Sequence, residues 1–145
     1  MGRHILVPID GSEASFDALA FALAQESADR LTVLTVVDPA EGVYGHGEAG
    51  YYSQESFDHA MNRAEERCEQ AKSIISETDG SDHIEVITEI EIGRPARTIT
   101  EFAEENEVDH IVMGSQGRSG VSRLLLGSVA ESVVRRSPVP VTVYR

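Results

Sequence analysis

The sequence predicts an α/β fold in which five parallel strands form one doubly wound sheet with helices on both faces. Short apolar runs rich in branched residues alternate with longer segments of helical periodicity, and turn-forming residues separate the two kinds of segment. Strands that alternate with helices form parallel sheets through right-handed crossovers. The chain has 145 residues, which is the length of one domain, so we expect a single domain over residues 1–145.

The first half of the chain contains two expected strands and two expected helices. Residues 3–9 form an apolar run too short for a helix, and Ser12 follows in a position to cap a helix. A second buried strand covers residues 31–37, and Ser53 opens a longer helix after an irregular loop at residues 40–52. On the first helix, the positions that we expect to face inward are Phe16, Leu19, Ala20, Leu23 and Ala24.

The second half of the chain continues this alternation. Residues 84–92 alternate branched with acidic side chains, which predicts a strand with one solvated side near a sheet edge. Pro95 begins a helix, and residues 109–113 form a central strand. The last helix is expected over residues 128–136, where Pro138 and Pro140 end it, and Val139, Val141 and Val143 form a terminal strand.

Composition excludes several classes of protein. The 41% hydrophobic content excludes a disordered chain, and no apolar stretch approaches the roughly 20 residues that cross a bilayer. The chain starts directly with a strand-like segment and contains one cysteine, Cys68, so we expect a cytoplasmic protein without disulfides. The net charge of −13 repels nucleic acid and anionic membrane surfaces, so we expect neither as a partner.

The charged residues are strongly biased. Lys72 is the only lysine, beside eleven arginines and 25 acidic residues. Such a surface stays hydrated and soluble in concentrated salt. We therefore hypothesise that the protein comes from a halophile.

The run from Gly114 to Ser128, GSQGRSGVSRLLLGS, predicts an anion-binding site directly after an expected strand. Glycine lets main-chain amides approach a ligand, and a helix that begins near Ser128 points its free N–H groups and its positive dipole end at phosphate. Residues 114–136 contain four arginines and one glutamate, so this segment is cationic in an acidic protein. Asp10, Val36 and Gly114 follow or end expected strands, where parallel sheets bind ligands.

Three segments resemble the universal stress protein family, and the similarity covers essentially the whole chain. They are VPIDGS, TVVDP and MGSQGRSGVSRLLLGSVAESVVRRSPVPVTV. In nucleotide-binding members the pattern G-x2-G-x9-G-[S/T] holds ATP, and Gly114, Gly117, Gly127 and Ser128 match it. The resemblance implies the Rossmann-like fold of adenine nucleotide alpha hydrolases, with ATP, AMP or ADP as the ligand, with or without Mg²⁺.

The resemblance also implies roles for single residues. Asp10 would meet the ribose, Val36 and Met113 would border the adenine, and the glycine-rich segment would hold the phosphates, with Arg118 as a charge-assisted contact. Carboxylates accept hydrogen bonds from ribose hydroxyls, and amides with a serine hydroxyl donate to phosphate oxygens. The candidate nucleotide-binding residues are Pro8, Asp10, Val36, Met113, Gly114, Gly117, Arg118, Gly127, Ser128 and Val129.

Other motifs carry less weight. Residues 45–50 match G-x-G-x-x-G, but they do not directly follow a strand, as a dinucleotide-binding motif must. The Walker pattern is absent, the five histidines have no zinc-ligand spacing, and no serine stands in a G-x-S-x-G elbow. Tyr44, Tyr51 and Tyr52 in the 40–52 loop are candidates for a lid over the nucleotide.

These observations favour a dimeric, nucleotide-binding regulatory module of the stress response, with protein partners that the sequence does not identify. The terminal strand from Val139 to Tyr144 would leave an open sheet edge, and we expect it to pair antiparallel with a second copy. One alternative is a slow ATPase or phosphotransferase in which Asp10 aligns metal or water. The other is a structural dimer that binds no nucleotide, in which the glycines only form turns.

Overall fold

The computed structural model describes residues 2–25, 27–40, 54–115 and 126–145. Within these ranges five strands form one sheet: β1 (His4–Ile9), β2 (Arg30–Val37), β3 (Glu85–Ile92), β4 (His110–Gly114) and β5 (Val141–Tyr144). All neighbouring strands run parallel, in the order β3-β2-β1-β4-β5. The predicted parallel sheet is confirmed.

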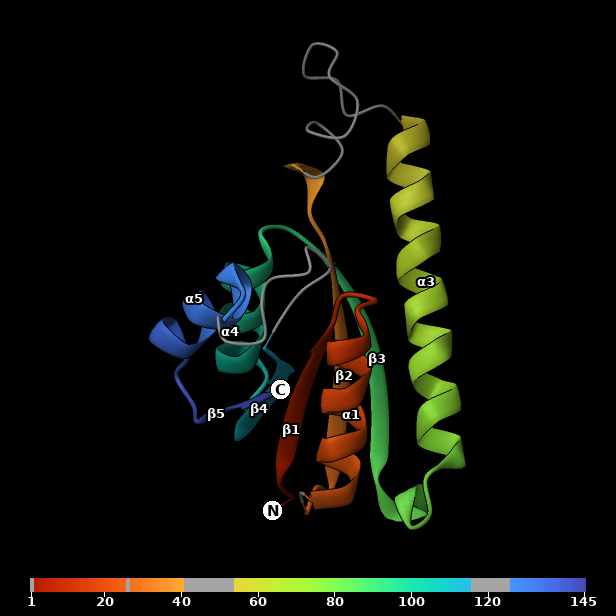
Figure 1. Ribbon diagram of the computed structural model, residues 1–145, viewed down its shortest axis with the longest axis vertical. Helices are drawn as coiled ribbons and strands as arrows, with labels where there is room; N and C mark the ends of the chain where they lie inside the picture. Colours follow the sequence, from red (N-terminus) through yellow and green to blue (C-terminus); the bar gives the residue numbers. More distant parts are fainter. Residues whose placement is uncertain (1, 26, 41–53, 116–125) are drawn as a thin grey trace.

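Helices cover both faces of the sheet, as predicted (Figure 1). The helices α1 (Glu13–Gln25) and α3 (Gln54–Glu77) lie on one face, and α4 (Pro95–Glu105) and α5 (Ser128–Arg136) lie on the other. A short 3₁₀ turn, Ser81–His83, joins α3 to β3. No helix in the described ranges is long and apolar enough to cross a membrane.

The strand β1 supplies both hydrophobic cores, because successive side chains of a strand point to opposite faces of the sheet. Ile5, Val7 and Ile9 pack with the α1 and α3 side. Leu6 packs with residues of α4 and α5 on the other side. All six residues of β1 are buried, which explains the continuous apolar run at the start of the sequence.

The predicted sheet edges are also confirmed. β3 lies at one edge, with its glutamates and Ile92 exposed, and β5 lies at the other. Helix starts follow the local signals: Pro95 begins α4, and the Ser12 hydroxyl accepts a hydrogen bond from the Ser15 amide at 3.1 Å, which caps α1.

The expected inward face of α1 is partly wrong. Ala20 and Ala24 are exposed and Leu23 is only half-buried. Residues 18–24 are all apolar, so their periodicity does not select a face, and packing of α1 against β1 and β4 decides instead. The buried residues of α1 are Ser15, Phe16, Ala18, Leu19 and Ala22.

Candidate functional site

The sheet opens between β1 and β4, where the strand order reverses. β1 pairs with β2 along its whole length, from His4 to Ile9. Its pairing with β4 covers only Ile5 and Leu6. Pro8, farther along β1, has no N–H to donate. The carboxyl-terminal halves of β1 and β4 therefore form a crevice at the position where doubly wound sheets bind ligands.

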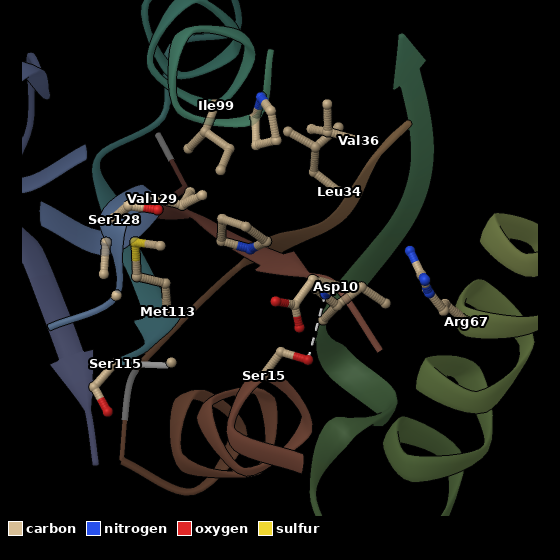
Figure 2. Close-up of a pocket in the computed structure, with 16 residues that line it drawn as sticks. Asp10, Ser15, Leu34, Val36, Arg67, Ile99, Met113, Ser115, Ser128 and Val129 are labelled. Atoms are coloured by element: carbon tan, nitrogen blue, oxygen red, sulfur yellow. Dashed lines mark hydrogen bonds between the residues drawn. The ribbon is translucent and has the colours of Figure 1, made fainter. Parts of the chain in front are cut away.

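A cavity of about 250 Å³ lies at this crevice, close to the lower end of the roughly 300–1,000 Å³ of typical small-molecule pockets. Eight of the ten candidate residues line it, and they come from β1 and the turn after it, β2, β4, and the N-cap and first turn of α5 (Figure 2). These eight are Pro8, Asp10, Val36, Met113, Gly114, Gly127, Ser128 and Val129. The structure thus brings together residues that the sequence separates by more than 100 positions.

Two candidate residues, Gly117 and Arg118, lie outside the described residues. The same holds for Arg123 and for Tyr44, Tyr51 and Tyr52 of the expected lid. Their places in the site remain predictions.

Hydrogen bonds within the β1–α1 turn orient the Asp10 carboxylate. Its Oδ1 accepts from the Ser12 amide at 2.9 Å, an Asx turn. The Ser15 hydroxyl donates to the Ser12 carbonyl at 2.8 Å and accepts from the Asp10 amide at 3.4 Å. The turn therefore holds the carboxylate at the cavity, where it can accept from ligand hydroxyls.

The amino end of α5 forms another side of the cavity. The first bond within α5 runs from the Glu131 amide to the Gly127 carbonyl at 2.9 Å, so the amides of Ser128, Val129 and Ala130 precede it. None of these three amides donates to an acceptor in the described part of the chain. The N-cap residue Gly127 has no side chain to cap them. This end of α5 therefore offers N–H donors and a positive dipole to an anion.

The Gly127 amide itself has a structural partner. It donates to the Ser115 carbonyl at 2.7 Å, and the Ser115 amide donates to the Tyr144 carbonyl at 2.8 Å. These two bonds attach the start of α5 to the ends of β4 and β5. Gly127 thus lies at the cavity with its amide already paired, and the donors for a ligand come from the residues that follow it.

The remaining wall is apolar. Leu34 and Val36 of β2 lie near Ile99 of α4 in Figure 2, and Pro95 of α4 and Met113 of β4 also line the cavity. Leu34, Ile99 and Met113 are buried. Such a wall suits a flat, mostly apolar group such as a purine base.

The sequence analysis missed eight lining residues. Ile9, Leu34, Ser115 and Ala130 are sequence neighbours of predicted ones, and the rule that parallel sheets bind ligands at strand ends could have found them. Arg67 comes from the middle of α3 and carried no sequence signal, because only the packing of α3 places it there. The others are Ser15, Pro95 and Ile99.

The described residues offer no support for a bound metal ion or for a nucleophilic cysteine. Among them, no three His, Cys, Asp or Glu side chains are grouped to hold a metal ion. Burial raises the pKa of the Cys68 thiol above its ordinary value, which disfavours the thiolate that a nucleophilic cysteine requires.

Comparison with known proteins decides the family. The family model described as the universal stress protein family matches residues 1–145. The chain belongs to the universal stress protein family. Among curated relatives, this universal stress protein is 32% identical to universal stress protein MJ0531 of Methanocaldococcus jannaschii, over 99% of this chain and 82% of that one.

Solved structures agree with this assignment. The universal stress protein UspA from Lactobacillus plantarum is 30% identical, with a TM-score of 0.80 over 99% of this chain and 97% of that chain. A universal stress protein solved in complex with cAMP is 22% identical, with a TM-score of 0.68 over 99% of this chain and 97% of that one. A family protein from Arabidopsis thaliana solved with AMP bound is 15% identical, with a TM-score of 0.59 over 98% and 90%. At these two lower identities the likeness concerns the fold.

Proposed function

We propose that this universal stress protein binds an adenine nucleotide, ATP, AMP or ADP, in the crevice between β1 and β4. The observation that carries the proposal is the meeting of three kinds of group at one cavity. An apolar wall, the Asp10 carboxylate and the open amino end of α5 lie around the same space. A base, a ribose and a phosphate require these three kinds of partner. The AMP and cAMP in two proteins of this fold are ligands of the same class.

Each part of the nucleotide has a proposed partner. The base lies against Val36 and Met113, and Asp10 accepts from ribose hydroxyls. The phosphates meet the amides of Ser128 and Val129, with Gly127 leaving room for their approach. Asp10 is the one carboxylate among the described lining residues, so any Mg²⁺ would be held mainly by phosphate oxygens and water.

We propose binding, and signalling through it, in preference to catalysis. A P-loop NTPase uses a lysine to cradle the terminal phosphates. The only lysine of the chain, Lys72, does not line the cavity and forms an exposed ion pair with Glu69 at 3.2 Å. The slow ATPase or phosphotransferase remains as the alternative, and phosphate release by the purified protein measures it.

The proposed module is a homodimer in the cytoplasm of a halophile. β5 pairs with β4 on one side only, so its other side can pair with a second copy through residues 139–144. A mass measurement at micromolar concentration in high salt tests this assembly, and a species of monomer mass alone would contradict it.

The binding test compares two carboxylate variants. Titration calorimetry with AMP, ADP and ATP, with and without Mg²⁺, is expected to give saturable binding for the wild type. Asp10→Asn should weaken it about 10-fold or more, because a hydrogen bond to a charged group is lost. Asp17→Asn on the exposed side of α1 removes the same charge away from the cavity and should leave affinity unchanged.

A second variant tests the phosphate side. Gly127→Val should abolish binding of all three nucleotides, because Gly127 is buried and its added side chain would occupy the phosphate approach. Thermal unfolding identifies a misfolded variant. Well-folded wild-type protein that takes up no adenylate in a saturable way would refute the proposed function.

A further inference from the structure

Arg67 gives the cavity a second positive group, on the side away from α5. It belongs to α3, which covers the face of the sheet opposite to α5 (Figure 1). In Figure 2, Asp10 lies between Arg67 on one side and Ser128 of α5 on the other. A phosphate held by the amino end of α5 and the Arg67 guanidinium would therefore lie on opposite sides of Asp10.

The β1–α1 turn makes room for this arginine. Gly11 has a φ of 86°, and a Cβ built on it would lie 2.8 Å from Arg67 Nε and 3.4 Å from Arg67 Cζ. Glycine at this position therefore allows both the left-handed turn and the close packing of the guanidinium against it. Because Asp10 and Gly11 are consecutive, Arg67 packs against the turn that carries the residue that we assign to the ribose.

A carboxylate and an arginine at one ribose have complementary chemistry. In dinucleotide-binding folds that take NAD a carboxylate binds the free ribose 2′-hydroxyl, and in those that take NADP a nearby arginine accommodates the 2′-phosphate. The guanidinium can bind a phosphate in a bidentate way, which a lysine cannot.

We propose that Arg67 makes this site selective for adenosine nucleotides that carry a second phosphate on the ribose 2′ or 3′ oxygen, in addition to the 5′-phosphate. This inference rests on the proposed function, since it uses the same cavity and the same place for the ribose. The 5′-phosphate meets the amides at the start of α5, Asp10 accepts from the remaining free hydroxyl, and Arg67 binds the ribose phosphate.

The test compares four ligands by titration calorimetry at constant salt: AMP, ADP, adenosine 2′,5′-bisphosphate and adenosine 3′,5′-bisphosphate. ADP is the matched ligand control, because its additional phosphate is on the 5′ side. Wild-type protein should bind one of the two bisphosphates about 10-fold more tightly than AMP. Arg67→Gln should remove that preference and leave the ADP to AMP ratio unchanged.

Two further variants complete the test. Arg63→Gln changes the same charge on an exposed part of the same helix and should keep the preference. Arg67→Lys keeps the charge without the forked geometry and should retain part of the preference, which also protects the test if Arg67→Gln folds poorly.

The outcomes separate this inference from the proposed function. Failure of the wild type to bind any of the four ligands overturns the inference, and failure to bind ATP as well overturns the proposed function. Binding of AMP without a preference for either bisphosphate overturns the inference alone. So does a preference that survives in Arg67→Gln, or a loss in that variant that is equal for ADP and the bisphosphates.

Discussion

Gly114 at the end of β4 provides a sharp test of how the site is built. A Cβ placed on Gly114 would lie 2.8 Å from both the carbonyl carbon and the carbonyl oxygen of Ala14, in the first turn of α1. Its φ is not in the left-handed region. The reason for glycine here is therefore the close approach of two backbones, and backbone atoms cannot move aside as a flexible side chain can.

We expect Gly114→Ala to lower the free energy of unfolding by about 1–3 kcal/mol, the usual cost of an additional methyl group in a packed interior. For a domain of this size, 1 kcal/mol corresponds to about 3 °C in Tm. Thermal unfolding should therefore show a decrease of about 3–9 °C. Because α1 begins with the turn that holds Asp10, nucleotide affinity should fall as well.

Two comparisons identify the cause. Gly80→Ala places a methyl group in open space at a φ of 83°, so it measures the cost of left-handed strain without a collision. The double variant Ala14→Gly with Gly114→Ala removes the contact with Ala14 Cβ at 3.1 Å but keeps the backbone collision, so it should recover little stability. A Tm for Gly114→Ala within about 1 °C of the wild type would refute the reasoning.

Two further predictions concern pH and salt. His4 is buried, and its Nδ1 donates to the Asn106 carbonyl at 3.1 Å while its Nε2 accepts from the Thr32 hydroxyl at 2.8 Å. Burial lowers the pKa of His4 below its ordinary value of 6.5. The unfolded chain then binds the proton more strongly, so stability should be complete above pH 6.5 and fall as the pH decreases through the folded-state pKa. Comparison of the Tm at pH 7.5 and 5.5 for the wild type and His4→Gln isolates this contribution, and equal pH dependence in both would contradict it. The net charge of −13 predicts that the Tm rises with KCl concentration, because salt screens the repulsion between acidic side chains. Most of the rise should occur below about 1 M, since the Debye length falls from about 10 Å at about 0.1 M to about 3 Å at about 1 M. Sucrose does not screen charge and should not reproduce this salt dependence. Full cooperative stability in salt-free buffer would be inconsistent with a halophile's protein.

The sequence was sufficient for the fold because each local signal agreed with the others. Branched apolar runs marked the strands, and Ser12 and Pro95 marked helix starts that the structure confirms. The acidic alternation of β3 placed it correctly at an edge. The inward face of α1 failed for the opposite reason, since residues 18–24 are uniformly apolar and offer no periodic signal.

The candidate site likewise contains residues that the sequence predicts and residues that only the packing of the fold reveals. The lining residues at strand ends and at the start of α5 are ones that the glycine motif and the strand-end rule can predict from the sequence. Arg67 depends on how α3 packs across the sheet and on the missing Cβ of Gly11, which are tertiary properties. The role of Gly114 is similar, because the sequence marks a glycine but not the backbone of Ala14 that requires it.

A short path of hydrogen bonds connects the phosphate side of the cavity to the sheet edge. The Gly127 amide donates to the Ser115 carbonyl, and the Ser115 amide donates to the carbonyl of Tyr144, on the edge strand β5. Under the proposed function, the same strand pairs with a second copy of the chain. A nucleotide that repositions Gly127 would thus alter the edge that forms the dimer. Because coupling between two binding events is reciprocal, the factor by which each bound nucleotide strengthens dimerisation must equal the factor by which dimerisation strengthens the binding of that nucleotide.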